Sequence, residues 1–210
     1  IIISLKRKQN LGPFCFDFWS RLCYFMPEMI AENIKSVTER IAKCCEKIGR
    51  SPASVRLIAV TKEAPVAAIE EAIGAGASLI GENRVQDAVV KHRTIGELAE
   101  WHLIGHLQTN KVRDAVKIFS LIHSVDSLKL ILAIDKEAAK LGKRQKILIQ
   151  VNTSGEASKF GASAEDAADL IKEAARCQNI SIEGLMTIAP EEADPEVVVP
   201  VHQARERPAC

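Results

Sequence analysis

The sequence predicts an α/β protein whose strands form a parallel sheet. Six short apolar runs begin at or near residues 55, 78, 101, 121, 146 and 181, so successive runs start 20 to 35 residues apart. Each run is separated from the next by a stretch long enough for a helix, and this alternation is typical of parallel sheets. The first run, 55–60 (VRLIAV), is almost wholly apolar, as expected for a strand that is covered on both faces.

The stretches around these runs carry helix signals. Before the first run, apolar residues recur every three or four positions from Ile30 to Ile48, which places them on one face of a helix. After the first run, Pro65 can open a second helix. Farther along, Ser163 with Asp166 three residues later resembles a capping box and predicts a helix start there.

Two architectures fit this alternation, an open doubly wound sheet and a (β/α)8 barrel. Periodicity does not decide between them. The first strand is not followed by a G-x-G-x-x-G segment, which removes the best reason to prefer a dinucleotide-binding fold.

The composition is that of an ordinary globular domain. Of the 210 residues, 47% are apolar and 26% are charged, which suffices for one core of moderate size. Lys and Arg number 28 against 27 Asp and Glu, so the net charge of +1 provides no basic surface for a nucleic acid. The apolar opening segment never reaches the ~18 uninterrupted residues of a membrane span. We therefore expect neither a nucleic-acid nor a membrane partner.

The cysteines and histidines do not indicate a metal site. No pair of the six cysteines has C-x-x-C spacing, so we interpret them as free thiols of a reducing compartment. This predicts a cytoplasmic location, with mitochondria as the alternative. No His, Asp and Glu cluster has metal-ligand spacing, and no G-x-S-x-G elbow of a hydrolase occurs. His102 and His123 lie inside strand patterns, where a core histidine is the simpler interpretation than a ligand.

The first 25 residues differ from the rest of the chain. Aromatic residues make up only 4% of the sequence, yet this segment holds six of the nine. It has no regular period, and we expect residues 1–25 to be a leader outside the domain, disordered or artificial, before a natural start at Met26. A targeting peptide is the alternative.

Polar residues that follow the apolar runs are the candidates for a functional site, because ligands collect at the carboxyl ends of parallel strands. Lys62 follows the first run. A lysine in that position can be partly desolvated, which favours the neutral amine that forms a Schiff base with an aldehyde. A solvated lysine at a strand end is the ordinary alternative.

The next two runs are followed by glycine-led polar segments, 81–86 (GENRVQ) and 105–111 (GHLQTNK). Such segments are typical of a binding rim, although each could also be a helix start whose Asn or Thr is only a cap. The fifth and sixth runs end in 152–156 (NTSGE) and 186–190 (MTIAP). Helix caps alone are not expected to place polar segments after most strands of one sheet.

Taken in order, these rims resemble the YggS/PROSC family of pyridoxal 5′-phosphate (PLP) homeostasis proteins. The resemblance runs from about residue 26 to about residue 200. The segments that carry it are 57–62 (LIAVTK), 81–86 (GENRVQ), 101–111 (WHLIGHLQTNK), 123–126 (HSVD), 150–152 (QVN) and 183–190 (EGLMTIAP).

The resemblance implies a fold and a site. The fold is a (β/α)8 barrel of the fold-type III PLP group, similar to the N-terminal domain of alanine racemase, and about six of its βα units are present here. Lys62 is implied to hold PLP as a Schiff base. Asn83 and Met186 are implied to lie near the pyridoxal ring, and His106 and Asn152 on the pocket wall.

The implied function is intracellular vitamin B6 homeostasis without catalysis. Because the racemase's second domain is absent from such proteins, no acid or base is expected opposite the ring. A PLP-dependent amino-acid racemase or lyase is the alternative. We expect PLP and small amines or amino acids as partners, and a monomer.

The sequence departs from the family pattern after Pro190. Two further strands, whose loops supply most of the phosphate cup in the family, have no counterpart in this sequence. The domain is therefore expected to be an incomplete barrel over 26–200 with a divergent tail over 201–210, truncated at its C-terminus. Loss of charge-assisted bonds worth ~1.5–3 kcal/mol each would weaken PLP binding.

Overall fold

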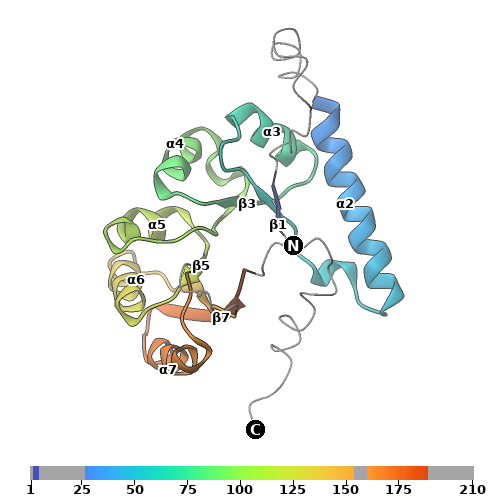
Figure 1. Cartoon of the computed structure of the whole chain (residues 1–210). Helices are drawn as coiled ribbons and strands as arrows, with labels where there is room; N and C mark the ends of the chain where they lie inside the picture. Colours follow the sequence, from blue (N-terminus) through green and yellow to red (C-terminus); the bar gives the residue numbers. More distant parts are fainter. Residues whose placement is uncertain (1, 5–26, 154–159, 189–210) are drawn as a thin grey trace, which may run out of the picture. The chain divides into compact units, whose positions relative to one another are not determined.

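The computed structural model describes residues 2–4, 27–153 and 160–188, and the chain divides into two compact units, Ile1–Leu103 and Ile104–Cys210. Each unit is a parallel sheet with helices in the connections between strands (Figure 1). Both belong to an α/β fold, as the alternation of the sequence predicts. Among the described residues, no helix combines the length and the apolar character needed to cross a bilayer.

The first unit contains four parallel strands in the order β1-β2-β3-β4. Its elements are β1 (Ile2–Ser4), α2 (Pro27–Lys47), the 3-10 turn η1 (Pro52–Ser54), β2 (Ile58–Val60), α3 (Val66–Gly74), β3 (Leu79–Glu82), α4 (Val85–Ile95), η2 (Gly96–Leu98) and β4 (Glu100–Leu103).

Burial explains this arrangement. Every residue of β2 and β3 is buried, which is the condition of a parallel strand that is covered on both faces. Helix α2 packs through Ile34 against Ala59 of β2, Ala72 of α3 and Ala77, so small side chains bring the helix close to the sheet.

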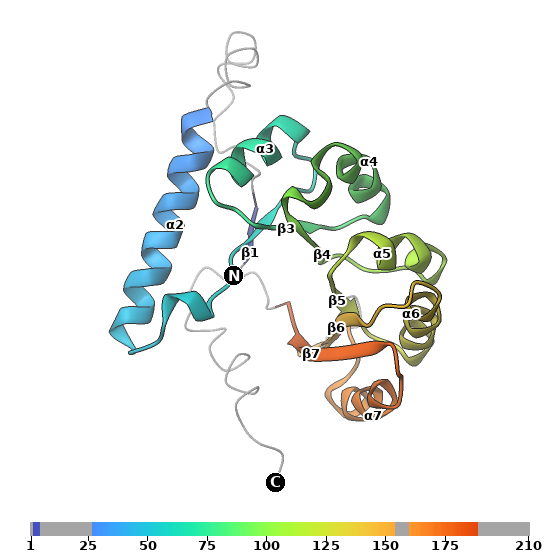
Figure 2. The same ribbon diagram turned by 180° about the vertical axis from the view of Figure 1, so that it is seen from behind.

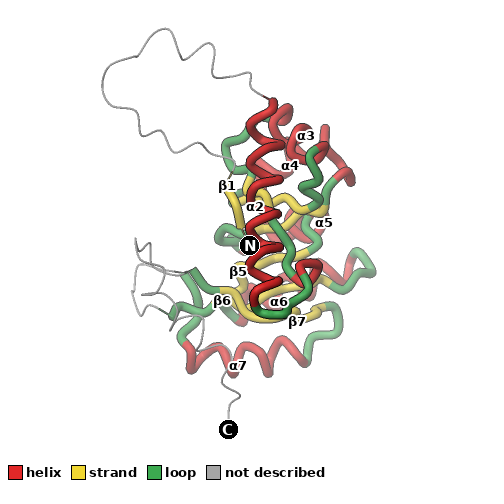
Figure 3. Tube along the Cα trace, turned by 90° about the vertical axis from the view of Figure 1, so that its right-hand side faces the viewer, coloured by secondary structure: helices red, strands yellow, loops and turns green. Residues whose placement is uncertain are grey.

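The second unit contains three parallel strands in the order β5-β6-β7. Helices α5, α6 and α7 lie along these strands (Figure 2), and α7 runs beside β7 (Figure 3). The elements are η3 (Thr109–Lys111), α5 (Val112–Ile118), β5 (Leu121–Val125), α6 (Leu128–Lys140), β6 (Gln145–Gln150), α7 (Ala164–Ala175) and β7 (Ile180–Met186). Its core is aliphatic, with Ile122, Ile131, Ile134 and Ile147 all at 0% exposure.

The six predicted strands are β2 to β7, each within a few residues of its apolar run. A strand that the sequence did not predict is β1, whose residues pair with β2 in the register Ile2↔Ile58. It lies in the segment that was expected to be a leader. The remainder of that segment and the tail over 201–210 lie outside the described residues, so the proposed domain boundaries stay predictions.

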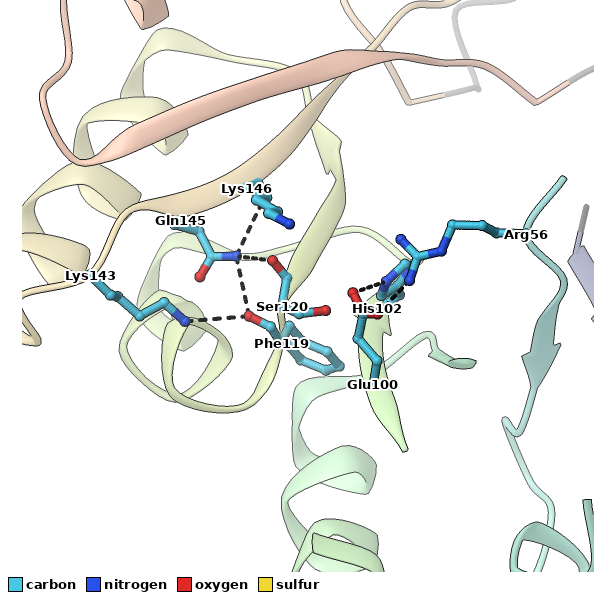
Figure 4. A network of polar contacts seen from close by, with 8 residues as sticks. All are labelled: Arg56, Glu100, His102, Phe119, Ser120, Lys143, Gln145 and Lys146. Carbon is cyan, nitrogen blue, oxygen red and sulfur yellow. Dashed lines mark hydrogen bonds and ion pairs between the residues drawn. The ribbon is translucent and has the colours of Figure 1, made fainter. Parts of the chain in front are cut away.

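Polar networks tie together the amino ends of the strands (Figure 4). In the first unit, Glu100 accepts from Arg56 and pairs with His102 at 3.1 Å. In the second, the Gln145 amide donates to the carbonyls of Phe119, Ser120 and Lys146, at 3.2, 3.1 and 3.1 Å.

These networks stand at the end opposite to where ligands collect, so we interpret them as structural. His102 and His123 are 2% and 6% exposed, which confirms them as core histidines.

Of the cysteines, Cys44, Cys45 and Cys177 lie in the described part of the chain, and all three are free thiols. Burial, together with the nearby Asp135 and Glu173 carboxylates, raises the pKa of the Cys177 thiol. Cys177 is therefore held in its protonated, poorly nucleophilic form.

Candidate functional site

In the first unit, the carboxyl ends of β2 and β3 bring two predicted site residues to one edge of the sheet. The two strands pair in parallel with Val60 opposite Gly81. Lys62 and Asn83 each stand two residues beyond that pair, so they leave adjacent strands at the same level. Both are half-buried.

Lys62 leaves β2 within a tight turn. The Ala64 amide donates to the Thr61 carbonyl at 2.9 Å, and Glu63 has a φ of +61°, a left-handed conformation that is unusual outside glycine. Among the residues that the structure describes, the Lys62 amine has no hydrogen-bond or ion-pair partner. A half-buried amine without a competing partner is suited to reaction with an aldehyde.

Beside Lys62 lies a buried charged network that the sequence reasoning did not identify. The Glu82 side chain is 0% exposed, and its Oε1 accepts from Thr61 Oγ1 at 2.5 Å and from Lys91 Nζ at 2.7 Å. Lys91 Nζ also donates to the Thr61 carbonyl at 2.7 Å. Glu82 belongs to the predicted rim 81–86, but Lys91 lies in α4, where nothing in its spacing indicated a contact with the strand ends.

In the second unit, His106 lies in a polar and aromatic cluster. Its imidazole stacks on the Phe160 ring, with centroids 4.1 Å apart and planes at 15°. Its Nδ1 is 3.8 Å from an Asp126 carboxylate oxygen. The loop that carries Phe160 is held by the buried Gln150 amide, which donates to the Phe160 carbonyl at 3.1 Å. Phe160 and Asp126 thus both contact the His106 ring within the second unit.

Asn152 and Met186 stand at the ends of the neighbouring strands β6 and β7. Gln150 pairs with Met186, and the Val151 amide donates to the Met186 carbonyl at 2.9 Å. The backbone amide of Asn152 donates to the Ala162 carbonyl at 2.8 Å, so Ala162 lies next to the end of β6. Met186 is buried and Asn152 is half-buried.

The structure therefore groups the five predicted site residues in two sets. Lys62 and Asn83 stand together in the first unit. In the second unit, Asn152 and Met186 stand at the carboxyl ends of β6 and β7, and His106 contacts Phe160 and Asp126. The role of each residue stays a prediction. Within the described residues, no group of three or more His, Cys, Asp or Glu side chains is placed to hold a metal ion.

Comparison with known proteins gives a consistent result. The family model described as "Alanine racemase, N-terminal domain" matches residues 31–207. Two curated relatives named pyridoxal phosphate homeostasis protein are each 39% identical to this chain. The one from Aquifex aeolicus aligns over 170 residues, 80% of this chain and 75% of the relative, and the one from Escherichia coli K12 over 168 residues, 77% and 71%.

A solved structure agrees with these relatives. PipY of Synechococcus elongatus, with PLP bound, superposes with a TM-score of 0.71 at 38% identity, covering 84% of this chain and 78% of PipY. An alanine racemase of Clostridium difficile matches at a TM-score of 0.55 and 16% identity over 63% of this chain and 35% of its own, a likeness of fold alone. The barrel family predicted from the rim segments is thereby confirmed, and the chain belongs to the family of the alanine racemase N-terminal domain, which it shares with the pyridoxal phosphate homeostasis proteins.

Proposed function

We propose that this chain binds PLP through a Schiff base on Lys62 and serves in vitamin B6 homeostasis without catalysing a reaction of its own. The relatives at 39% identity are named for PLP homeostasis, and the PipY structure contains PLP. The observation that carries the proposal is the Lys62 amine, half-buried at the carboxyl end of β2 and unpaired among the described residues.

The residues around Lys62 fit this cofactor. The amine has no carboxylate partner within the described chain, and Asn83, which follows the adjacent strand, would supply an amide for a polar ring substituent. The other buried oxygen of the neighbouring Glu82 carboxylate, Oε2, has no hydrogen-bond partner among the described residues, so this edge of the sheet keeps one unused acceptor.

The bound group would supply an aldehyde carbon, which Lys62 Nζ attacks to form a C=N bond while the aldehyde oxygen leaves as water. Attack by another amine at the same carbon returns Lys62 as a free amine and carries the cofactor away. On this proposal Lys62 therefore needs only to hold PLP and to release it to another amine. On this proposal the exchange partners are small amines or amino acids, and the protein acts as a cytoplasmic monomer.

The second candidate is a fold-type III racemase or lyase, favoured by the fold it shares with alanine racemase. Racemisation needs an acid or base opposite the ring in addition to the lysine. The sequence contains a single tyrosine, Tyr24, which lies outside the described residues. The non-catalytic role therefore has the stronger support.

The test is a comparison of the whole chain with Lys62→Ala. The native chain should develop the absorbance band of a protonated Schiff base with PLP, and borohydride should fix the label on the Lys62 peptide. Lys62→Ala should lose both signals, while the control Lys129→Ala, at an exposed lysine on α6, should keep them. Label on another lysine, or none, would overturn the proposal.

A second assay separates the two candidates. We expect the PLP-loaded chain to exchange the α-proton of alanine for deuterium no faster than free PLP does. Exchange well above that rate, abolished in Lys62→Ala, would establish the enzyme instead.

A further inference from the structure

Glu82 places a charged carboxylate at the end of β3, a strand that is buried at every residue. Its side chain is 0% exposed and that of its partner Lys91 only 12%. The desolvation penalty of burying such an ion pair offsets much of the attraction between its two charges. Two apolar side chains of similar volume therefore often stabilise a fold at least as well. Stability alone is therefore a weak reason for this pair.

The contacts of the pair lead directly to Lys62. Lys91 Nζ donates to Glu82 Oε1 and also to the Thr61 carbonyl, each at 2.7 Å. That carbonyl belongs to the peptide bond that joins Thr61 to Lys62. It accepts the Ala64 amide as well, at 2.9 Å, so the same oxygen closes the turn on which Lys62 stands.

A third contact fixes the side chain of the preceding residue. Thr61 is fully buried, and its Oγ1 donates to Glu82 Oε1 at 2.5 Å. The Thr61 amide donates to the Gly81 carbonyl at 3.0 Å, which extends the β2–β3 pairing to the residue before Lys62. Backbone amide, backbone carbonyl and hydroxyl of Thr61 are thus all held.

We propose that Glu82 and Lys91 are positioning residues for Lys62. Lys91 acts through the Thr61 carbonyl to fix the turn that presents the Lys62 amine, and Glu82 holds Lys91 and the Thr61 hydroxyl in place. The proposal rests on the proposed attachment of PLP to Lys62, and it assigns two further residues, one of them outside the strand ends, to that site.

The decisive variant replaces both charges together, Glu82→Gln with Lys91→Met. Because the two changes together leave no buried unpaired charge, this double variant should fold, and its thermal unfolding should stay near that of the native chain. Lys91→Arg keeps a cation that can reach the Thr61 carbonyl and serves as the rescue variant. Arg93→Met, an exposed cation on the same helix, is the matched control.

Two readouts are measured on each chain. The first is the borohydride-fixed label on Lys62 after incubation with a limiting amount of PLP, expressed relative to the exposed Lys172 in the same sample. The second, independent of PLP, is hydrogen exchange at the Ala64 amide, which reports the turn.

In the double variant we expect labelling of Lys62 relative to Lys172 to fall by about tenfold, the effect of losing a charge-assisted hydrogen bond, and Ala64 to exchange faster. Lys91→Arg should recover most of the labelling, and Arg93→Met should match the native chain. Native labelling and native exchange in a folded double variant would overturn the inference while leaving the proposed function standing. Absence of Lys62 label in the native chain would overturn both.

Discussion

The imidazole of His106 lies nearly parallel to the Phe160 ring, with ring centroids 4.1 Å apart. The two residues are 54 positions apart in the sequence, and one is a predicted pocket residue while the other belongs to the returning chain after β6. Phe160 is 58% exposed, so its ring is held more by this stacking and by the Gln150 contact to its carbonyl than by burial.

Replacing Phe160 should therefore change His106 more than it changes stability. In Phe160→Leu, the His106 ring protons lose the ring current of a stacked aromatic neighbour, and their NMR signals should move downfield. The free energy of unfolding should fall by about 0.5 kcal/mol, the low end for an aromatic pair, since the pair is exposed. His92, which is tilted at 57° to Trp101, is the internal reference and should not move. Unchanged His106 signals would show that the stacking is not populated in solution.

Gly161 should be intolerant of any side chain. Its φ of +125° is strained for other residues, and a Cβ would lie 2.6 Å from the Asn152 amide nitrogen, a backbone atom that cannot turn aside. We expect Gly161→Ala to lower the free energy of unfolding by about 3 kcal/mol or more, since strain and overpacking add.

Gly142→Ala is the control for this measurement. Gly142 also has a positive φ, +61°, but apart from the adjoining residues no atom of the described chain lies within 4 Å of the Cβ position. Gly142→Ala should lower the free energy of unfolding by about 1 to 2 kcal/mol, the cost of a left-handed backbone conformation alone. Equal losses in the two variants, measured by urea unfolding, would argue against the close approach at Asn152.

The strand-helix alternation could be predicted from the sequence because parallel strands that are buried on both faces show as short apolar runs. The cap at Ser163 could be predicted too, since it depends on residues only three apart. Contacts between residues far apart in the sequence could not be predicted, because only the fold brings such residues together. Lys91 meets Thr61 across 30 residues and Phe160 meets His106 across 54, and neither pair has a local signal.

Strand β1 was missed for a related reason. Three residues carry no usable period, and the strand exists only by pairing with β2. Lys62, by contrast, was a candidate from its place just beyond a buried strand, but position alone also fits a solvated lysine, and its assignment to PLP came from the family resemblance. The candidate residues at the strand ends could therefore be proposed from the sequence, whereas the contacts made by Lys91 and Phe160 could not.

Ser163 should contribute measurably to α7. Its Oγ accepts from the Asp166 amide at 3.0 Å and donates to the Asp166 carboxylate at 2.7 Å. Ser163→Ala should lower the free energy of unfolding by about 1 kcal/mol, the usual cost of losing an N-cap. Ser127 occupies the N-cap of α6 without a side-chain cap bond, so Ser127→Ala should leave stability nearly unchanged. Equal effects of the two substitutions would contradict the assignment of the cap.

Lys143 should make stability depend on pH in the alkaline range. Its amine donates to the Val116 carbonyl at 2.5 Å, and burial lowers its pKa from the ordinary value of 10.5. The unfolded chain then binds this proton at pH values where the folded chain has released it, so stability rises with pH between the two values. The cost of burying the charged amine is present in full below the folded pKa and disappears as the pH approaches 10.5.

The native chain should accordingly gain stability relative to Lys143→Met as the pH is raised through the alkaline range, in a series of urea unfolding curves. Lys129→Met, an exposed lysine on α6, supplies the baseline for removing one positive charge. A difference between native chain and Lys143→Met that stays constant with pH, or that shrinks as the pH rises, would mean that the folded chain does not disfavour the charged amine at this position.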